Sequence, residues 1–212
     1  MGGRIKKLQP NAAAPVTLME PRLPDLKCVV VGDDSVGKTS MLMGYATNRY
    51  PTQHVPSVFD NYAGSLKLAG RLIQMQIIDT QQYEENPKFR HSLYSGTNIF
   101  VVCFSVIRPE SLNHVEEVWL PEIRTYAPKT PFILVGAQAD LRSAETILQM
   151  LSTTGQQPVT SAEGAAVARR TGAACYIETS PEVEKNVRKL INGAIASILK
   201  VKTPDSSACS VL

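Results

Sequence analysis

The sequence lacks a long apolar run. Its longest, around residues 99–104, is far shorter than the about eighteen apolar residues that a membrane-spanning helix needs. The basic first ten residues, MGGRIKKLQP, are followed by no apolar stretch, so we expect no secretory signal there. With 43% hydrophobic and 19% charged residues, the bulk of the chain is predicted to be globular rather than disordered.

Strong net charge and closely spaced cysteines are also missing. The net charge is only +3 and the basic residues are scattered, so we expect no nucleic-acid partner. We also expect the protein to be a monomer. Cys28, Cys103 and Cys175 lie in apolar segments without metal-type spacing and are expected to be free core thiols of a reduced compartment. The single tryptophan, Trp119, falls in a helical apolar pattern and is expected to pack in the core.

The sequence does contain a phosphate-binding pattern. Residues 32–39, GDDSVGKT, match G-x-x-x-x-G-K-T and directly follow the apolar run at 28–31. In this arrangement the loop's N–H groups and a helix N-terminus bind phosphate. Lys38 would reach the outer phosphates and the Thr39 hydroxyl would ligate Mg²⁺. The alternative is an ordinary glycine-containing turn, but the preceding strand and following helix favour phosphate binding.

Strand and helix patterns alternate along the chain. We expect strands at about 26–32, 63–68, 72–78, 99–104, 132–135 and 175–178, and helices at about 37–47, 109–126, 143–157, 161–171 and 183–200. Residues 81–97 are predicted to be irregular, and the pair of strands within 63–78 to form an antiparallel hairpin. The pattern predicts an α/β fold with a doubly wound, six-stranded, mostly parallel sheet and one antiparallel edge strand. Its domain would span 25–200, after a leader at 1–24 and before a tail at 201–212.

Ligands of such sheets bind at the carboxyl ends of the strands. There the sequence places Gly32, Asp79, Asp140 and Ser180, which we expect to converge on one pocket. A carboxylate at Asp79 could hold Mg²⁺ through water. A carboxylate at Asp140 could accept two hydrogen bonds from the N1 and N2 edge of guanine, which adenine cannot supply.

With these signals in this order, residues 27–200 resemble the Ras superfamily, and within it the Rho family of small GTPases, most of all its Rac-like branch. The segments that carry the resemblance are VPSVFDNY (55–62), CFSV (103–106), VWLPEIRTYAP (118–128) and VGAQADLR (135–142). The helical excursion at 143–157 lies where Rho proteins have their insert helix. The resemblance implies the P-loop NTPase small-GTPase fold, GTP or GDP with Mg²⁺ as cofactors, and a role as a switch in cytoskeletal signalling.

Position by position, the resemblance implies a set of nucleotide-binding residues. They are Gly32, Asp34, Ser35, Val36, Gly37, Lys38, Thr39, Ser40, Tyr50, Ser57, Asp79, Gln138, Asp140 and Ser180. Among them Tyr50 takes the place of an aromatic residue at the base edge. Thr39 and Ser57 would be the metal ligands, with Ser57 standing where the family has a threonine.

The resemblance also implies contacts with other proteins. Effector and regulatory proteins would bind through Tyr50–Tyr62 and Gln81–Arg90. Within the first of these segments, Phe59, Asp60 and Tyr62 match the family's effector-contact stretch.

The catalytic positions depart from the family, which reads D-T-A-G-Q-E where this chain reads DTQQYE. Gln82 replaces the glycine that contacts the γ-phosphate, Tyr83 replaces the glutamine that orients the attacking water, and Asp34 replaces a phosphate-loop glycine. Because water orientation and an arginine finger together supply about 10⁵-fold of the rate, we assign no catalytic residue and expect slow or absent hydrolysis. Gln138 in place of lysine, and Pro181 without an N–H for guanine, leave open a nucleotide-insensitive pseudo-GTPase that acts as an interaction scaffold.

The last four residues, CSVL, have C-a-a-X form, and a terminal leucine favours geranylgeranylation of Cys209. We therefore expect the protein at the cytoplasmic face of a membrane, namely the plasma membrane, with a cytosolic pool. One prenyl chain usually needs a second signal, and the tail offers only Lys200 and Lys202 upstream.

Overall fold

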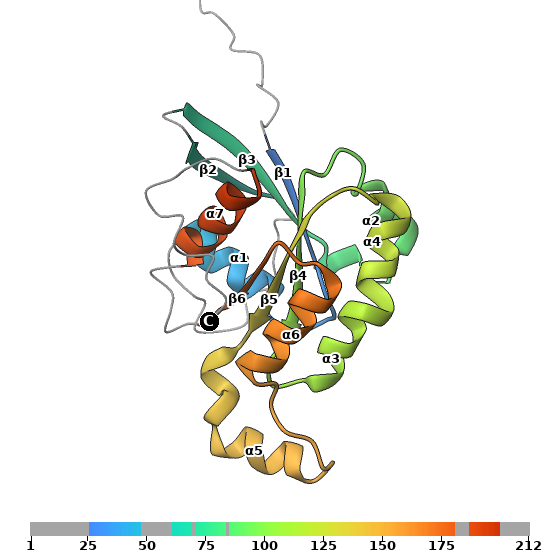
Figure 1. Ribbon diagram of the computed structural model, residues 1–212, viewed down its shortest axis with the longest axis vertical. Helices are drawn as coiled ribbons and strands as arrows, with labels where there is room; N and C mark the ends of the chain where they lie inside the picture. Colours follow the sequence, from blue (N-terminus) through green and yellow to red (C-terminus); the bar gives the residue numbers. More distant parts are fainter. Residues whose placement is uncertain (1–25, 48–60, 69–70, 84, 181–186, 200–212) are drawn as a thin grey trace, which may run out of the picture.

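A computed structural model describes residues 26–47, 61–68, 71–83, 85–180 and 187–199 (Figure 1). Its sheet has the strand order β2-β3-β1-β4-β5-β6. The strands are β1 (Leu26–Val31), β2 (Asn61–Leu68), β3 (Arg71–Asp79), β4 (Ile99–Ser105), β5 (Phe132–Ala137) and β6 (Cys175–Glu178). All neighbouring pairs are parallel except β2 with β3, which is antiparallel. The predicted α/β class with a mostly parallel sheet is therefore confirmed, and the predicted leader and tail lie outside the described residues.

Helices cover both faces of the sheet (Figure 1). They are α1 (Lys38–Thr47), α2 (Pro87–Ser92), α3 (Pro109–His114), α4 (Leu120–Tyr126), α5 (Glu145–Ser152), α6 (Ser161–Thr171) and α7 (Val187–Ile198). Within the described ranges, no helix is both long and apolar enough to cross a bilayer. Strand β4 is buried at every position because helices lie on both of its sides, which explains its continuous apolar sequence.

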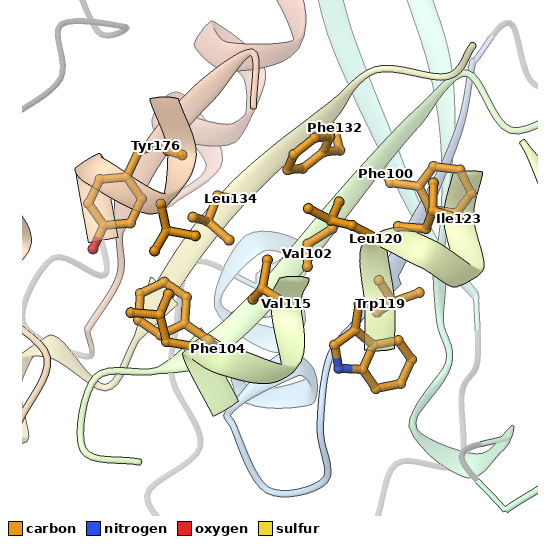
Figure 2. Close-up of a cluster of buried hydrophobic side chains, with 14 of the residues drawn as sticks. Phe100, Val102, Phe104, Val115, Trp119, Leu120, Ile123, Phe132, Leu134 and Tyr176 are labelled. Atoms are coloured by element: carbon orange, nitrogen blue, oxygen red, sulfur yellow. The ribbon is translucent and has the colours of Figure 1, made fainter. Parts of the chain in front are cut away.

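Two apolar clusters form the core, one on each face. The first packs α1 and α7 against the sheet, and the second packs α3, α4 and α6 against the opposite face. Figure 2 shows the second cluster, in which Val115, Trp119 and Leu120 lie over sheet residues that include Phe100 and Val102. Trp119 is thus a core residue, as predicted. Cys28, Cys103 and Cys175 are buried free thiols, also as predicted, and burial raises the pKa of Cys28 and Cys103 to about 12.

The prediction that residues 81–97 are irregular is wrong. The segment forms a 3₁₀ turn, η1 (Gln81–Tyr83), followed by α2. The Asn86 side chain caps α2 by accepting a hydrogen bond of 3.2 Å from the Phe89 N–H, and Pro87 occupies its first turn. A proline at this position is compatible with the start of a helix, because no backbone N–H is needed there.

Two of the predicted helices are also less regular than their patterns suggest. Between α3 and α4 lies a π-helical segment, Val115–Trp119, which ends where the Leu120 N–H bonds to the Val115 carbonyl five residues back. Pro121 follows at once and has no N–H to continue the ordinary pattern. The excursion predicted at 143–157 is helical only over α5, after a 3₁₀ turn, η3 (Ala139–Ser143).

Candidate functional site

The loop between β1 and α1 requires glycine at its first position. Gly32 has φ +145°, and a Cβ there would lie 2.2 Å from the Cys103 carbonyl oxygen, so no other residue fits. Gly37 also has positive φ, +99°, and Ser35 between them has φ 58°. The Met41 N–H donates to the Gly37 carbonyl at 3.0 Å, which begins the helix and turns its N-terminal end toward the loop. This geometry is that of a phosphate-binding loop.

Lys38 is enclosed by this loop. Its side chain is in the core environment, with only 1% of the residue exposed. The Nζ donates to the carbonyl oxygens of Gly32 at 2.9 Å and Asp33 at 2.6 Å. These bonds fix the ammonium group at the loop, where it can act as a point charge for phosphate. The Val36 side chain is fully buried in the core, so only its backbone can face a ligand, and Ser40 follows in the first turn of α1.

Thr39 and Asp79 are brought together as the sequence predicted. The Thr39 Oγ1 donates to Asp79 Oδ2 at 2.6 Å. Asp79 is 2% exposed and sits at the end of β3, paired in register with Val30 of β1. Hydroxyl and carboxylate oxygens are the ligands that Mg²⁺ prefers, either directly or through water. The donor set of this pair therefore fits a magnesium ion beside the phosphate loop.

Asp140 and Ser180 lie on two neighbouring loops, which follow β5 and β6. The Ala139 N–H donates to the Thr179 carbonyl at 3.1 Å, and the Thr179 N–H to the Gly136 carbonyl at 2.9 Å, so the two loops are bound together. The Asp140 Oδ1 is buried and has no hydrogen-bond partner in the part of the chain that the structure describes. A buried acceptor without a donor is unfavourable, and the N–H edge of a bound base would satisfy it.

Gln138 connects the base-side loop to the phosphate loop. Its backbone is left-handed, with φ 62° and ψ 34°, and its amide oxygen accepts a hydrogen bond from the Ser105 hydroxyl. Its Cγ lies 3.7 Å from where a Cβ of Gly37 would stand, so its aliphatic portion lies beside the phosphate loop. Gln138 therefore lies between the phosphate loop and the loop that contains Asp140, although it lacks the charge of the lysine that the resemblance implies.

The structure reveals a role for Asp33 that the sequence analysis missed. Its Oδ1 accepts a 2.8 Å hydrogen bond from the Trp119 indole N–H, and its Oδ2 lies 2.6 Å from the Nδ1 of His114. The next residue is held too, because Arg108 Nη1 donates to the Asp34 carbonyl at 2.6 Å. The phosphate loop is thus attached to the helix that contains the π segment. No local sequence pattern predicts the Asp33–Trp119 hydrogen bond, because the two residues are 86 positions apart.

Two of the positions that depart from the family motif, Asp34 and Tyr83, are described by the structure. Asp34 is exposed on the loop. The Tyr83 ring packs against Phe89 of α2, with ring centroids 4.6 Å apart, and the Tyr83 carbonyl accepts from Arg90 Nη1 at 3.1 Å. The residue at the family's glutamine position is therefore an aromatic side chain packed on a helix. A phenol ring has no carboxamide with which to orient a water molecule.

Several predicted residues lie outside the described part of the chain. They are Tyr50, Ser57, Phe59, Asp60, Pro181 and Cys209. Tyr62 is described and packs partly against the first core cluster. Among the described residues, no group of three or more His, Cys, Asp or Glu side chains could hold a metal ion, so a divalent ion here would depend on phosphate and hydroxyl oxygens as well.

Comparison with known proteins agrees with this geometry. A protein-family model described as "Ras family" matches residues 27–200. The match covers nearly all of the sheet, the phosphate loop and both base-side loops.

Proposed function

The chain belongs to the Ras family of small GTP-binding switch proteins, and we propose that it is a Rho-like member that binds GTP with Mg²⁺ but hydrolyses it slowly or not at all. Ras-family proteins bind GTP and GDP, typically with Mg²⁺. The Rac-like segments, together with the helix α5 at the position of the Rho insert, support the Rho-like assignment.

The residues of the site would each bind a different part of the nucleotide. Lys38 and the N–H groups of residues 32–39 would hold the phosphates. Thr39 and Asp79 would hold Mg²⁺, which offsets the phosphate charge. Asp140 would accept hydrogen bonds from the guanine edge. Tyr50, Ser57 and Ser180 would complete the site, as the resemblance implies.

The proposal of slow hydrolysis rests on the packing of the Tyr83 ring against Phe89. With this ring held on α2, no carboxamide is available at the place where the family orients the attacking water. Asp34, which is exposed on the phosphate loop, would add a carboxylate beside an already anionic phosphate and would crowd the space that an arginine finger needs. A protein of this kind would be controlled by nucleotide exchange, abundance or membrane delivery rather than by hydrolysis.

Membrane attachment and partner binding complete the proposal. A geranylgeranyl group on Cys209 would anchor the protein to the cytoplasmic face of the plasma membrane. Effector and regulatory proteins would bind across Tyr50–Tyr62 and Gln81–Arg90. The scaffold alternative draws on Gln138 and Pro181, whose replacement of family residues weakens base recognition.

One experiment separates the switch from the scaffold. Nucleotide is extracted from the purified protein, and single-turnover GTP hydrolysis is followed for the parent and for a variant with Asp34→Gly and Tyr83→Gln. We expect retained GTP in the parent and at least about tenfold faster hydrolysis in the double variant, since two parts of the rate machinery are restored. Tyr126→Gln, at an exposed tyrosine of α4, is the control and should leave the rate unchanged.

The opposite results are equally clear. A parent that carries no nucleotide and has no micromolar affinity for GTP or GDP is a scaffold. A parent that hydrolyses GTP at a rate ordinary for the family refutes our interpretation of Asp34 and Tyr83.

A further inference from the structure

Gln81 reaches the hydroxyl that the magnesium site depends on. The Thr39 Oγ1 lies within hydrogen-bond distance of two oxygens, Asp79 Oδ2 at 2.6 Å and the Gln81 Oε1. Gln81 lies in the segment expected to contact other proteins, and the family motif has alanine at its position. The side chain is thus an addition of this chain to the metal site.

The three oxygens of Thr39, Asp79 and Gln81 do not have enough hydrogens between them for each close contact to be a hydrogen bond. A hydroxyl has one hydrogen, whereas a carboxylate and an amide carbonyl have none to donate. The other carboxylate oxygen of Asp79 already accepts the Gln81 N–H at 3.1 Å. Thr39, Asp79 and Gln81 therefore bring three oxygens together around a single hydrogen. Neighbouring oxygens on a magnesium ion, each at about 2.1 Å from it, are about 3 Å apart, so a hard divalent cation suits such a cluster.

The turn that contains Gln81 is fixed in place. Besides the Gln81 N–H bond to Asp79, the Tyr83 N–H donates to the Thr80 carbonyl at 2.9 Å. The Thr80 hydroxyl, which is fully buried, donates to the Val30 carbonyl at 2.8 Å. The amide of Gln81 is therefore presented by the end of β3 rather than by a free loop.

We infer that the Gln81 Oε1 is a direct ligand of the divalent cation in the nucleotide complex, at a position that the family leaves to water. The inference rests on the proposed function, because the cation enters with the nucleotide. The extra protein ligand tightens cation binding and so slows nucleotide release. If instead the amide nitrogen faced Thr39, Gln81 would donate to the hydroxyl and compete with the cation, so the two arrangements predict opposite effects of removing it.

The test measures Mn²⁺ affinity in the GDP complex of the full chain, with free Mn²⁺ determined by electron paramagnetic resonance. Gln81→Ala removes the ligand, and Gln81→Met keeps the length of the side chain without its oxygen. Both variants should bind Mn²⁺ about tenfold more weakly, the scale of effect of losing a partner at a metal site. Gln149→Ala, at an exposed glutamine of α5, should change nothing.

GDP affinity in excess chelator and the thermal midpoint are measured for each variant, so that a folding defect is recognised. Unchanged or tighter Mn²⁺ binding in both folded Gln81 variants overturns the inference and leaves the proposed function standing. A parent protein that binds no GDP overturns the proposed function, and the inference with it.

Discussion

At the scale of single residues, the buried Asp140 Oδ1, which has no hydrogen-bond partner among the described residues, leads to a specific prediction about the ligand. Asp140→Asn replaces an acceptor by an amide whose N–H₂ would face the N–H groups of guanine. We expect GDP affinity to fall at least about a hundredfold, which is about 2.7 kcal/mol, since a donor then opposes donors. Xanthosine diphosphate, which has a carbonyl in place of the guanine amino group, should bind the variant better than it binds the parent.

Titration calorimetry with both nucleotides measures these affinities. Glu145→Gln makes the same chemical change at an exposed position of α5 and serves as the control. Equal GDP affinity in Asp140→Asn and in the parent would mean that this carboxylate does not read the base.

Asp33 is the second residue whose environment allows a quantitative test. Its carboxylate is largely buried and accepts the Trp119 indole N–H, so the two side chains should depend on each other for stability. In a double-mutant cycle of Asp33→Ala and Trp119→Phe, we expect a coupling free energy of about 1–2 kcal/mol. Urea unfolding followed by circular dichroism gives the values, because one substitution removes the only tryptophan. Additive effects within about 0.3 kcal/mol would contradict the coupling.

At the scale of elements, Glu122 joins α4 to α2. Its carboxylate accepts hydrogen bonds from Arg90 Nη2 at 2.6 Å and from the Tyr94 hydroxyl at 2.5 Å. Burial disfavours the charge on Glu122, but these bonds, together with the His91 ring whose Nε2 lies 3.1 Å from Oε2, outweigh it and hold the pKa of Glu122 below its ordinary 4.5. A carboxyl whose pKa is lowered by folding stabilises the fold above its ordinary pKa, and this contribution is lost as the pH falls through the folded-state pKa.

On acidification below pH 4.5, the Glu122→Gln variant should therefore lose less folding stability than the parent does. The free energy of unfolding in urea, measured between about pH 7 and 3, tests this, and the variant should show a shallower acid limb than the parent. Glu116→Gln is the matched control: the Arg170 hydrogen bond lowers the pKa of Glu116 too, but this pair is exposed and contributes little. Parallel acid limbs for the parent and Glu122→Gln would show that Glu122 does not link the two helices.

The elements also show which parts of the fold a sequence can predict. Helix α6 was predicted with its bounds because its signals are local, a Thr160–Glu163 capping box at one end and a left-handed Gly172 at the other. Helix α2 was missed because it is six residues long and mostly exposed, so it has no apolar period. The order of Thr39, Asp79 and Asp140 along the chain places them at the carboxyl ends of parallel strands, which the parallel order of β1, β3, β4 and β5 bears out. The Asp33–Trp119 bond depends on tertiary packing that no local pattern encodes.

At the scale of the whole molecule, the proposed geranylgeranyl group and the modest net charge predict how the protein would divide between membrane and cytosol. A single prenyl chain gives stable attachment only with a second signal, and a net charge of +3 on 212 residues is a weak one. We therefore expect the chain to divide between membranes and cytosol, with a membrane fraction that falls as salt is raised.

Substitutions at the carboxyl end test the lipid directly. Cys209→Ser removes the acceptor sulfur and should move the protein to the cytosolic fraction on cell fractionation. Leu212→Ser keeps the cysteine but changes the terminal residue to one that favours farnesyl, so mass spectrometry should find the shorter lipid and fractionation a weaker attachment, because each buried CH₂ contributes about 0.8 kcal/mol. An unchanged distribution of Cys209→Ser would place the membrane signal elsewhere in the chain. An unmodified Cys209 in the parent would remove the membrane from the proposed function but leave the nucleotide site untouched, since the two lie in separate parts of the sequence.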